Sequence, residues 1–134
     1  MSNSNKKIGN NFEREFCEIL SKNGFWVHNF AQNQDGQPAD VIAVRDGGSF
    51  LIDCKVCITG RFQLNRIEEN QQSAMQHWVD TGNEEAWFAL KIENDIVMMR
   101  YSDLMLLKTV QSSLNKSEIL KHGVMFEKWV DNEY

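Results

Sequence analysis

Two stretches of the chain carry apolar residues at the spacing of an amphipathic helix. In the first, the apolar positions recur at i, i+4, i+7 and i+8: Phe12, Phe16, Ile19 and Leu20. This pattern predicts a helix over about 11–23. A similar stripe (Ile67, Ala74, Met75 and Trp78) predicts a second helix over about 66–80, and one polar residue, Gln71, interrupts it.

Capping residues set the predicted ends of these helices. Asn10 followed by Glu13, and Asn65 followed by Glu68, have the form of a capping box, which satisfies free N–H groups of the first turn. Gly24 suits the end of the first helix, because glycine accepts the left-handed conformation that often closes a helix.

Short runs rich in β-branched and aromatic residues predict five strands: 25–30, 39–45, 49–56, 87–92 and 96–101. The sequence Asp46-Gly47-Gly48 separates the second run from the third, and Glu93-Asn94-Asp95 separates the last two. Such turn residues predict two hairpins.

The last third of the chain is expected to hold two more helices and a strand. Ser102 is the predicted cap of a helix over about 103–111, and Ser117 the cap of a shorter helix that ends at Gly123. The apolar residues of 124–130 predict a last strand.

This order of elements predicts one α/β domain over residues 1–134, with a mixed sheet flanked by helices. The polar segment 1–9 is expected to be loose, and the polar segment 31–38 to be a loop.

Composition excludes several classes of protein. The hydrophobic share of 42% and the charged share of 25% are ordinary for a globular protein. The three cysteines have no framework spacing, the first residues lack the apolar stretch of a signal peptide, and no run is apolar enough to span a membrane. We therefore expect a protein of the reducing cytoplasm, with no membrane partner.

The net charge of −5 does not favour a nucleic-acid partner. The charge is uneven, however: residues 1–66 have 8 Lys/Arg and 7 Asp/Glu, whereas residues 67–134 have 6 and 12. Acidic residues that hold a cation also count as negative in a formal sum. The composition thus permits DNA binding without indicating it.

Charged residues inside two predicted strands carry the candidate chemistry. Asp40 lies inside the run ADVIAV, and Asp53 and Lys55 lie inside FLIDCKV. Residues two apart in a strand point to one face, and the hairpin brings Asp40 close to Asp53. Paired carboxylates predict Mg²⁺, with Mn²⁺ able to substitute, and the lysine predicts stabilisation of charge on a phosphate. The alternative is a salt bridge of Lys55 with Asp40 or Asp53.

Two further residues are candidates for the same site. Glu13 lies at the edge of the first apolar stripe and is a candidate metal ligand, or else only the glutamate of its capping box. Gln71 occupies an apolar position of the second helix, where a buried amide must be hydrogen-bonded. It either orients an acidic ligand or a water, or caps a strand carbonyl.

The motif Cys54-Lys55-Val56-Cys57 has the C-x-x-C form of redox and zinc sites. Residues three apart in a strand point to opposite faces, so the two thiols should not meet, and Cys54 should lie opposite Asp53. Arg61 and Arg66 follow the acidic strand and are either phosphate-binding or merely solvated. The cations expected to contact DNA are Lys6, Lys7, Arg14, Arg61 and Arg66.

Together these segments resemble the PD-(D/E)XK nuclease superfamily, and more narrowly the RecU-type Holliday junction resolvases of bacteria and their phages. The resemblance rests on GNNFERE, ADVIAV, FLIDCKV and above all RFQLNRIEENQQSAM at residues 61–75. It extends to about residue 122. It implies a restriction-endonuclease-like sheet and a homodimer that nicks two strands of a four-way junction in recombination and repair.

The resemblance also implies roles for single residues. Asp40, Asp53 and the Cys54 carbonyl would hold Mg²⁺, with Glu13 as the helix glutamate of the family. Lys55 would be the catalytic lysine, and Gln71 would be the helix glutamine.

The chain departs from the family pattern at two places. Ala39 separates Pro38 from the aspartate, and the long stalk insertion of cellular members is reduced to residues 31–38. The short loop suggests a phage-like version and leaves two other activities open. One is a nuclease of the same superfamily for duplex ends, flaps or a recognition sequence, and the other is a non-catalytic DNA-binding recombination accessory.

Overall fold

The computed structural model describes residues 2–30, 37 and 39–134, and side chains from residue 4 onward. The helical elements of this part are α1 (Ser2–Lys22), the short 3-10 helix η1 (Leu64–Arg66), α2 (Glu69–Asp80), α3 (Tyr101–Lys108), α4 (Lys116–His122) and α5 (Phe126–Val130). The strands are β1 (Trp26–Asn29), β2 (Val41–Arg45), β3 (Gly48–Val56), β4 (Arg61–Gln63), β5 (Trp87–Ile92), β6 (Asp95–Arg100), β7 (Ser113–Asn115) and β8 (Val124–Met125).

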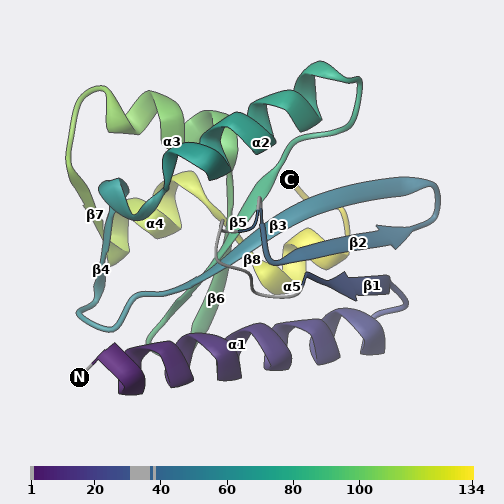
Figure 1. The fold of residues 1–134 in the computed structure, drawn as a ribbon, viewed down its shortest axis with the longest axis horizontal. Helices are drawn as coiled ribbons and strands as arrows, with labels where there is room; N and C mark the ends of the chain where they lie inside the picture. Colours follow the sequence, from purple (N-terminus) through teal and green to yellow (C-terminus); the bar gives the residue numbers. More distant parts are fainter. Residues whose placement is uncertain (1, 31–36, 38) are drawn as a thin grey trace.

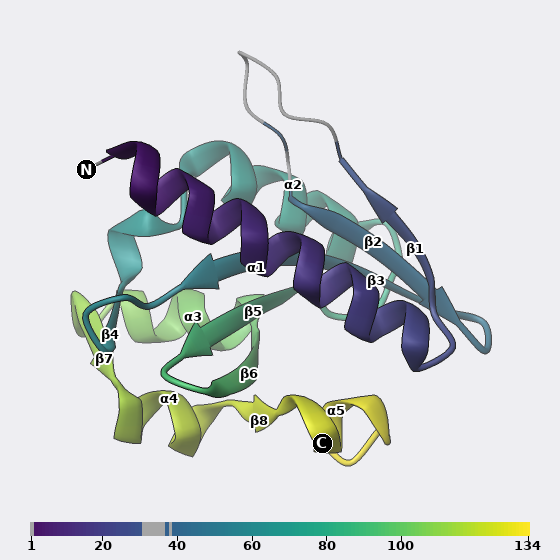
Figure 2. The same cartoon turned by 90° about the horizontal axis from the view of Figure 1, so that it is seen from below.

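A mixed sheet forms the centre of the molecule (Figure 1). Within the described residues its strand order is β1-β2-β3-β5-β6-β8, and β3 and β5 are its one parallel pair. The strands β4 and β7 form a separate antiparallel pair. Helix α1 crosses one face of the sheet, and α2 and α3 lie over the other (Figures 1 and 2). The predicted α/β fold, a mixed sheet flanked by helices, is confirmed.

Side chains of β3 alternate between two hydrophobic cores. Ile52 and Cys54 pack with the α1 side, whereas Leu51 and Cys57 pack with the α2 side. This is the alternation expected of a strand covered on both faces. Asp53 and Lys55 share the parity of Leu51, so they face the side of α2.

Both predicted hairpins are present. In the first, β2 and β3 pair from Val41↔Ile52 to Arg45↔Gly48, and the turn residues Asp46 and Gly47 both have positive φ (51° and 82°). A two-residue turn with two positive φ values matches the twist of the strands, which explains the Asp-Gly pair. The second hairpin joins β5 to β6.

The first helix begins earlier than predicted. Residues 1–9 were expected to be loose, but α1 starts at Ser2, so Asn10 is inside the helix and is not its cap. Ile8 continues the apolar stripe one turn before Phe12, although its side chain stays 42% exposed. The predicted end is confirmed: Gly24 has φ +86°, and the N–H groups of Gly24 and Phe25 donate to the carbonyls of Ser21 and Leu20.

Three other predicted caps were wrong by a few residues. Helix α2 begins after Glu68 and not after Asn65, which lies in η1. Helix α4 is capped by Asn115, whose side chain accepts from the Glu118 N–H at 2.9 Å, and not by Ser117. Ser102 is already inside α3, where its N–H donates to Glu85.

The C-terminal segment was predicted as a strand over 124–130, but only β8 is extended there. Phe126, Trp129 and Val130 are buried at helical spacing in α5. Their burial against the α1-side core decides the conformation of this short apolar run. The pairing of β4 with β7, which joins residues about fifty apart, had no local signal. The predicted loop 31–38 lies outside the described residues except for Gln37. No helix of the described part is long and apolar enough to cross a membrane.

Candidate active site

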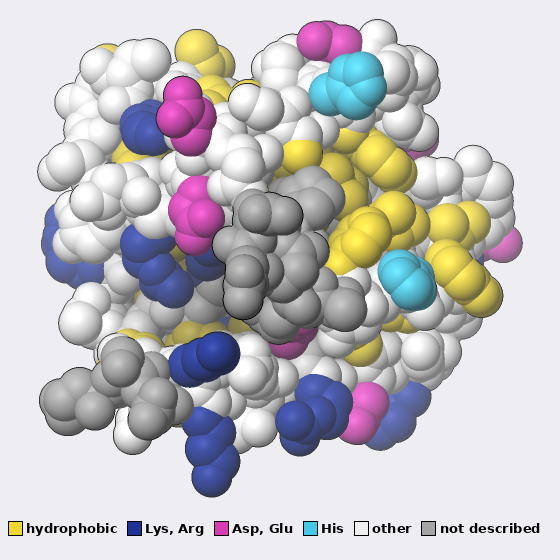
Figure 3. Space-filling view, in the orientation of Figure 1, with side chains coloured by type: hydrophobic (Ala, Val, Ile, Leu, Met, Phe, Trp, Pro, Cys, Tyr) yellow, Lys and Arg dark blue, Asp and Glu magenta, His cyan; other side chains and the backbone are white. Residues whose placement is uncertain are grey.

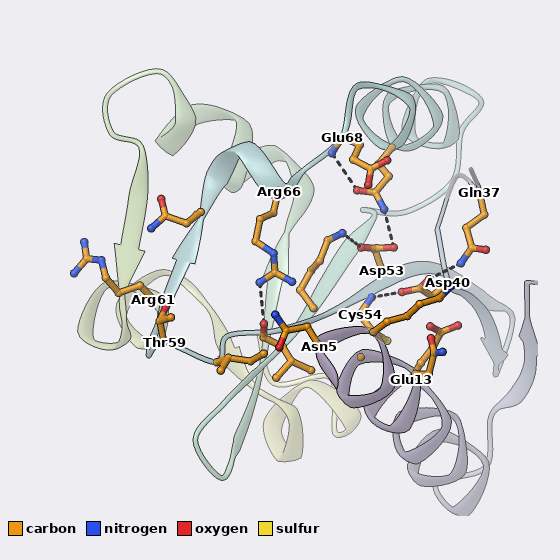
Figure 4. Close-up of a pocket in the computed structure, with 18 residues that line it drawn as sticks. Asn5, Glu13, Gln37, Asp40, Asp53, Cys54, Thr59, Arg61, Arg66 and Glu68 are labelled. Carbon is orange, nitrogen blue, oxygen red and sulfur yellow. Dashed lines mark hydrogen bonds and ion pairs between the residues drawn. The ribbon is translucent and has the colours of Figure 1, made fainter. Parts of the chain in front are cut away.

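A groove of about 640 Å³ opens where strand β2 begins (Figure 4). The last residue pair of the β2–β3 ladder is Val41↔Ile52, so β3 continues beyond it with one edge free. The N-terminal half of α1 forms one wall of the groove, and β4, η1 and the start of α2 form the other. The groove is lined by the five candidate catalytic residues: Glu13, Asp40, Asp53, Lys55 and Gln71.

Asp40 directly precedes the first residue of β2, and two neutral donors hold its carboxylate. The Cys54 N–H, which has no β2 partner at this point, donates to Oδ2 at 2.9 Å. The side chain of Gln37 donates through Nε2 to Oδ1 at 2.6 Å. The Asp40 side chain is buried to 8% exposure. These contacts fix the carboxylate over the free edge of β3.

Asp53 is the most buried acid of the site, at 1% exposure. Gln71 donates from Nε2 to Oδ1 at 3.0 Å, and the Nζ of Lys55 lies 3.2 Å from Oδ2. The Glu68 N–H donates to Oε1 of Gln71 at 3.2 Å, which leaves the amide nitrogen of Gln71 to face Asp53. Gln71, the polar residue in the apolar stripe of α2, therefore binds the carboxylate of Asp53 on β3.

Three acids, Glu13, Asp40 and Asp53, converge in this groove, with the ammonium of Lys55 beside Asp53. Burial and then the charge of Asp40 raise the pKa of Glu13 to about 7. The same two causes raise the pKa of Asp53 to about 8, against the opposing effect of Lys55. Because α1 starts at Ser2, Glu13 has no capping role, and its side chain points to Asp40 from the helix (Figure 4). With these pKa values, Asp53 and part of Glu13 are protonated near neutral pH in the metal-free site.

The donor set fits a hard divalent cation. Oxygen ligands select Mg²⁺ or Mn²⁺, and a cation would offset both the burial of these carboxylates and the charge of Asp40, which raise the pKa values. The buried Oδ2 of Asp53 also accepts no hydrogen bond from a described group, since its contact with Lys55 is an ion pair only. In residues 2–30, 37 and 39–134, no three His, Cys, Asp or Glu side chains are yet arranged as metal ligands. The carboxylates instead point at the protein donors named above.

The thiols of the C-x-x-C motif lie apart, as predicted. Cys54 packs with the α1-side core and Cys57 with the other, and all three cysteines of the chain are free. Burial raises the pKa of both thiols, that of Cys57 to about 11. A protonated, buried thiol is neither a nucleophile nor a ready metal ligand.

We expect Cys54→Ala and Cys57→Ala to keep the cleavage rate of the wild type. Cys57→Ala should lower the melting temperature, because Cys57 is fully packed in the core and its removal leaves a small cavity. Single-turnover cleavage and thermal unfolding measure the two effects. Loss of cleavage in a variant that melts like the wild type would restore a chemical role for the thiol.

Only some of the predicted DNA-binding cations line the groove. Lys6, Arg61 and Arg66 do, whereas Lys7 and Arg14 do not and are exposed elsewhere on α1. Arg66 donates to the Val56 carbonyl at 2.8 Å and Arg61 to the Ser113 hydroxyl at 2.8 Å. Both guanidinium groups are therefore held on the wall opposite α1 (Figure 4).

Sequence reasoning missed two groups of residues at the site. Gln37 has no sequence signal, because its role depends on the tertiary contact with Asp40 and on Asn70, which donates to its backbone carbonyl at 3.3 Å. The early turns of α1, which add Asn5, Gly9 and Asn10 to the groove, were missed with the start of the helix. Their sequence signal is weak, because Ile8 alone continues the apolar stripe there.

Comparison with protein families matches the family of archaeal Holliday junction resolvases (Hjc) over residues 4–133. The chain belongs to this family. Its members resolve Holliday junctions, so the activity of the chain is that of a junction-resolving endodeoxyribonuclease, one of the metal-dependent nucleases. The predicted enzyme class is thereby confirmed.

The structure is similar to a solved resolvase as well. The 1.6 Å structure of Archaeoglobus fulgidus Hjc, a Holliday junction resolvase from an archaeal hyperthermophile, superposes with a TM-score of 0.70 at 20% sequence identity. The alignment covers 91% of this chain and 99% of that one. At this identity the likeness shows the shared fold. Comparison with curated protein sequences gave no match.

Proposed function

We propose that the chain cuts the DNA backbone of four-way junctions with Mg²⁺, or Mn²⁺ in its place, bound at the groove by Asp40, Asp53 and Glu13, with the Cys54 carbonyl as a further ligand. The observation that carries this proposal is the convergence of Asp40, Asp53, Lys55 and Gln71 on the free edge of β3. The burial of Asp53 and Asp40 beside Glu13 in one groove also supports a cation there, because a bound ion would offset the burial of these carboxylates.

Each residue has a defined task in this proposal. A bound divalent ion would polarise the scissile phosphate and lower the pKa of a water. Lys55, whose ammonium enters the groove beside Asp53, stabilises the charge that develops on the phosphate. Gln71 holds Asp53 in place, and Gln37 holds Asp40. Lys6, Arg61 and Arg66 neutralise neighbouring phosphates, and Lys7 and Arg14 contact DNA outside the groove.

The function is tested by incubating the protein with a synthetic four-way junction, a linear duplex and a flap, each with Mg²⁺ or with EDTA. Paired symmetric nicks in the junction alone, lost in EDTA, are the expected result. Cutting of all three substrates would favour the broader nuclease, and tight binding without cutting would favour a non-catalytic accessory.

The narrower resemblance to RecU-type enzymes of phages stays a prediction, as does the cellular compartment. The three free thiols support the reducing cytoplasm of a bacterial cell or of a phage-infected host.

A homodimer belongs to the same proposal, because two strands of a two-fold symmetric junction need two active sites. Support comes from an aromatic row on the edge strand β1. Trp26 is 63% exposed and stacks on His28, which meets Phe30 edge-on. Figure 3 shows hydrophobic side chains gathered on this side of the molecule, over β1 and β2. Such an exposed apolar surface suits a second copy of the chain.

We expect Trp26→Arg to yield a monomer that still nicks single strands but no longer makes paired nicks. The matched control is Leu106→Arg, since Leu106 is 69% exposed on α3, away from this surface. Sedimentation velocity and a plasmid-borne cruciform, which separates nicked from linear product, measure the two effects. A wild type that sediments as a monomer while making paired nicks would contradict the dimer.

A further inference from the structure

Gly9 is a glycine inside a helix, where the fold gives no reason for one. It lies in the second turn of α1 (Ser2–Lys22), and its φ is not in the left-handed region. Glycine is the least favourable helix residue after proline, because it loses the most backbone freedom and adds no side-chain contact. An alanine at this position would make a better helix.

Close packing does not explain the glycine either. A Cβ built on Gly9 meets nothing within 4 Å, so no element of the described chain approaches it. By contrast, a Cβ on Gly123 would come within 2.5 Å of Val97, which is a real packing requirement. Contacts within the described chain therefore do not account for the glycine.

The open space beside Gly9 is the active-site groove. Gly9 lines it midway between Asn5 and Glu13, four residues from each and therefore near the same side of the helix. Figure 4 shows Asn5 and Glu13 on the groove side of α1. Any side chain at position 9 would enter the groove about one helical turn, 5.4 Å, from the candidate metal ligand Glu13.

The groove around Gly9 has the polar groups that phosphates prefer. Lys6, Asn5 and Asn10 lie beside it on α1, and Arg61 and Arg66 lie on the opposite wall. The first turn of α1 has no acidic residue. Lysine, arginine and asparagine side chains are common partners of the DNA backbone.

We propose that Gly9 is a close-approach residue, which lets the sugar–phosphate backbone of the cut strand lie against α1 next to the scissile phosphate. This inference rests on the proposed function. Lys6 and the two asparagines bind the flanking phosphates, while the bare helix surface at Gly9 sets how deeply the strand enters.

The experiment compares Gly9→Ala, Gly9→Leu and Gly9→Gln with the control Asn11→Leu. Asn11 is exposed, lies about 200° around the helix from Gly9 and does not line this groove. Three quantities are measured: the melting temperature, Mn²⁺ binding by calorimetry, and junction affinity in EDTA at fixed salt. Single-turnover cleavage follows with Mg²⁺.

Gly9→Ala should melt higher than the wild type and bind the junction almost as well. Gly9→Leu and Gly9→Gln should also melt no lower than the wild type and bind Mn²⁺ normally, yet bind the junction at least tenfold more weakly and cut it more slowly. Asn11→Leu should match the wild type in all of these measurements.

Wild-type junction affinity and cleavage in Gly9→Leu and Gly9→Gln would overturn the inference, and so would an equal loss in Asn11→Leu. In both cases the wild type still cuts the junction, so the proposed function stands. If the wild type neither binds nor cuts the junction, both proposals fail.

Discussion

Replacing Lys55 by methionine is expected to slow single-turnover cleavage of a four-way junction by roughly 10²–10³-fold, the usual loss when one preorganised donor to a developing negative charge is removed. Methionine keeps most of the length and apolar stem of the side chain. The ammonium of Lys55 is the one cation within 4 Å of an acid in the described part of the groove, and it lies 3.2 Å from Asp53. Junction binding should remain, because Lys6, Arg61 and Arg66 still line the groove.

The matched control is Lys91→Met on the neighbouring strand. Lys91 pairs with Glu15 at 3.2 Å on the surface and does not line the groove, so its loss should leave the rate unchanged. Measurement at saturating enzyme separates the chemical step from binding. Equal rates for Lys55→Met and the wild type would remove Lys55 from the mechanism.

Asp53→Asn is expected to abolish detectable cleavage and to change how stability depends on pH. Folding raises the pKa of Asp53 from an ordinary 3.8 to about 8. At pH values between these two, the native state therefore keeps a proton on Asp53 that the unfolded state has lost. The free energy of unfolding without metal should therefore fall as the pH rises from about 4 to 8. Glu13, with a pKa raised to about 7, adds to the same fall.

Urea unfolding in EDTA at several pH values measures this slope for both proteins. The wild type should lose stability toward pH 8 and regain it with Mg²⁺, because an ion that binds the native state stabilises it. The variant should show a shallower slope and little response to Mg²⁺. The slope, and not the absolute stability, is the diagnostic quantity, because asparagine also loses the ion pair of Asp53 with Lys55. An unchanged slope and an unchanged Mg²⁺ response would contradict the assignment of Asp53.

Local signals explain what the sequence predicted well. The Asp46-Gly47 turn requires two positive φ values, which few residue pairs accept, so the β2–β3 hairpin and the meeting of Asp40 with Asp53 followed from it. Gln71 broke an apolar stripe, and a polar residue at a buried position needs a partner. That partner is Asp53.

Tertiary contacts explain what the sequence did not predict. The first turns of α1 have one apolar residue, Ile8, which is too few for a periodic pattern. The sequence therefore did not predict the part of the groove wall that contains Gly9. The run 124–130 is apolar enough for a strand or a helix, and burial of Trp129 beside Phe25 and Phe50 decides for a helix. Gln37 is one of several polar residues in the sequence segment 31–38, and nothing local distinguishes it from the others.

Two backbone hydrogen bonds of Asp40 hold together the two ends of the connection between β1 and β2. The Phe30 N–H donates to the Asp40 carbonyl at 2.9 Å, and the Asp40 N–H donates to the Ile52 carbonyl at 3.2 Å. The chain between residues 30 and 40 therefore leaves and rejoins the sheet at adjacent points, and added residues there cost little closure entropy. Evolution or an engineer can lengthen this connection to reshape substrate choice while the cutting chemistry stays where it is.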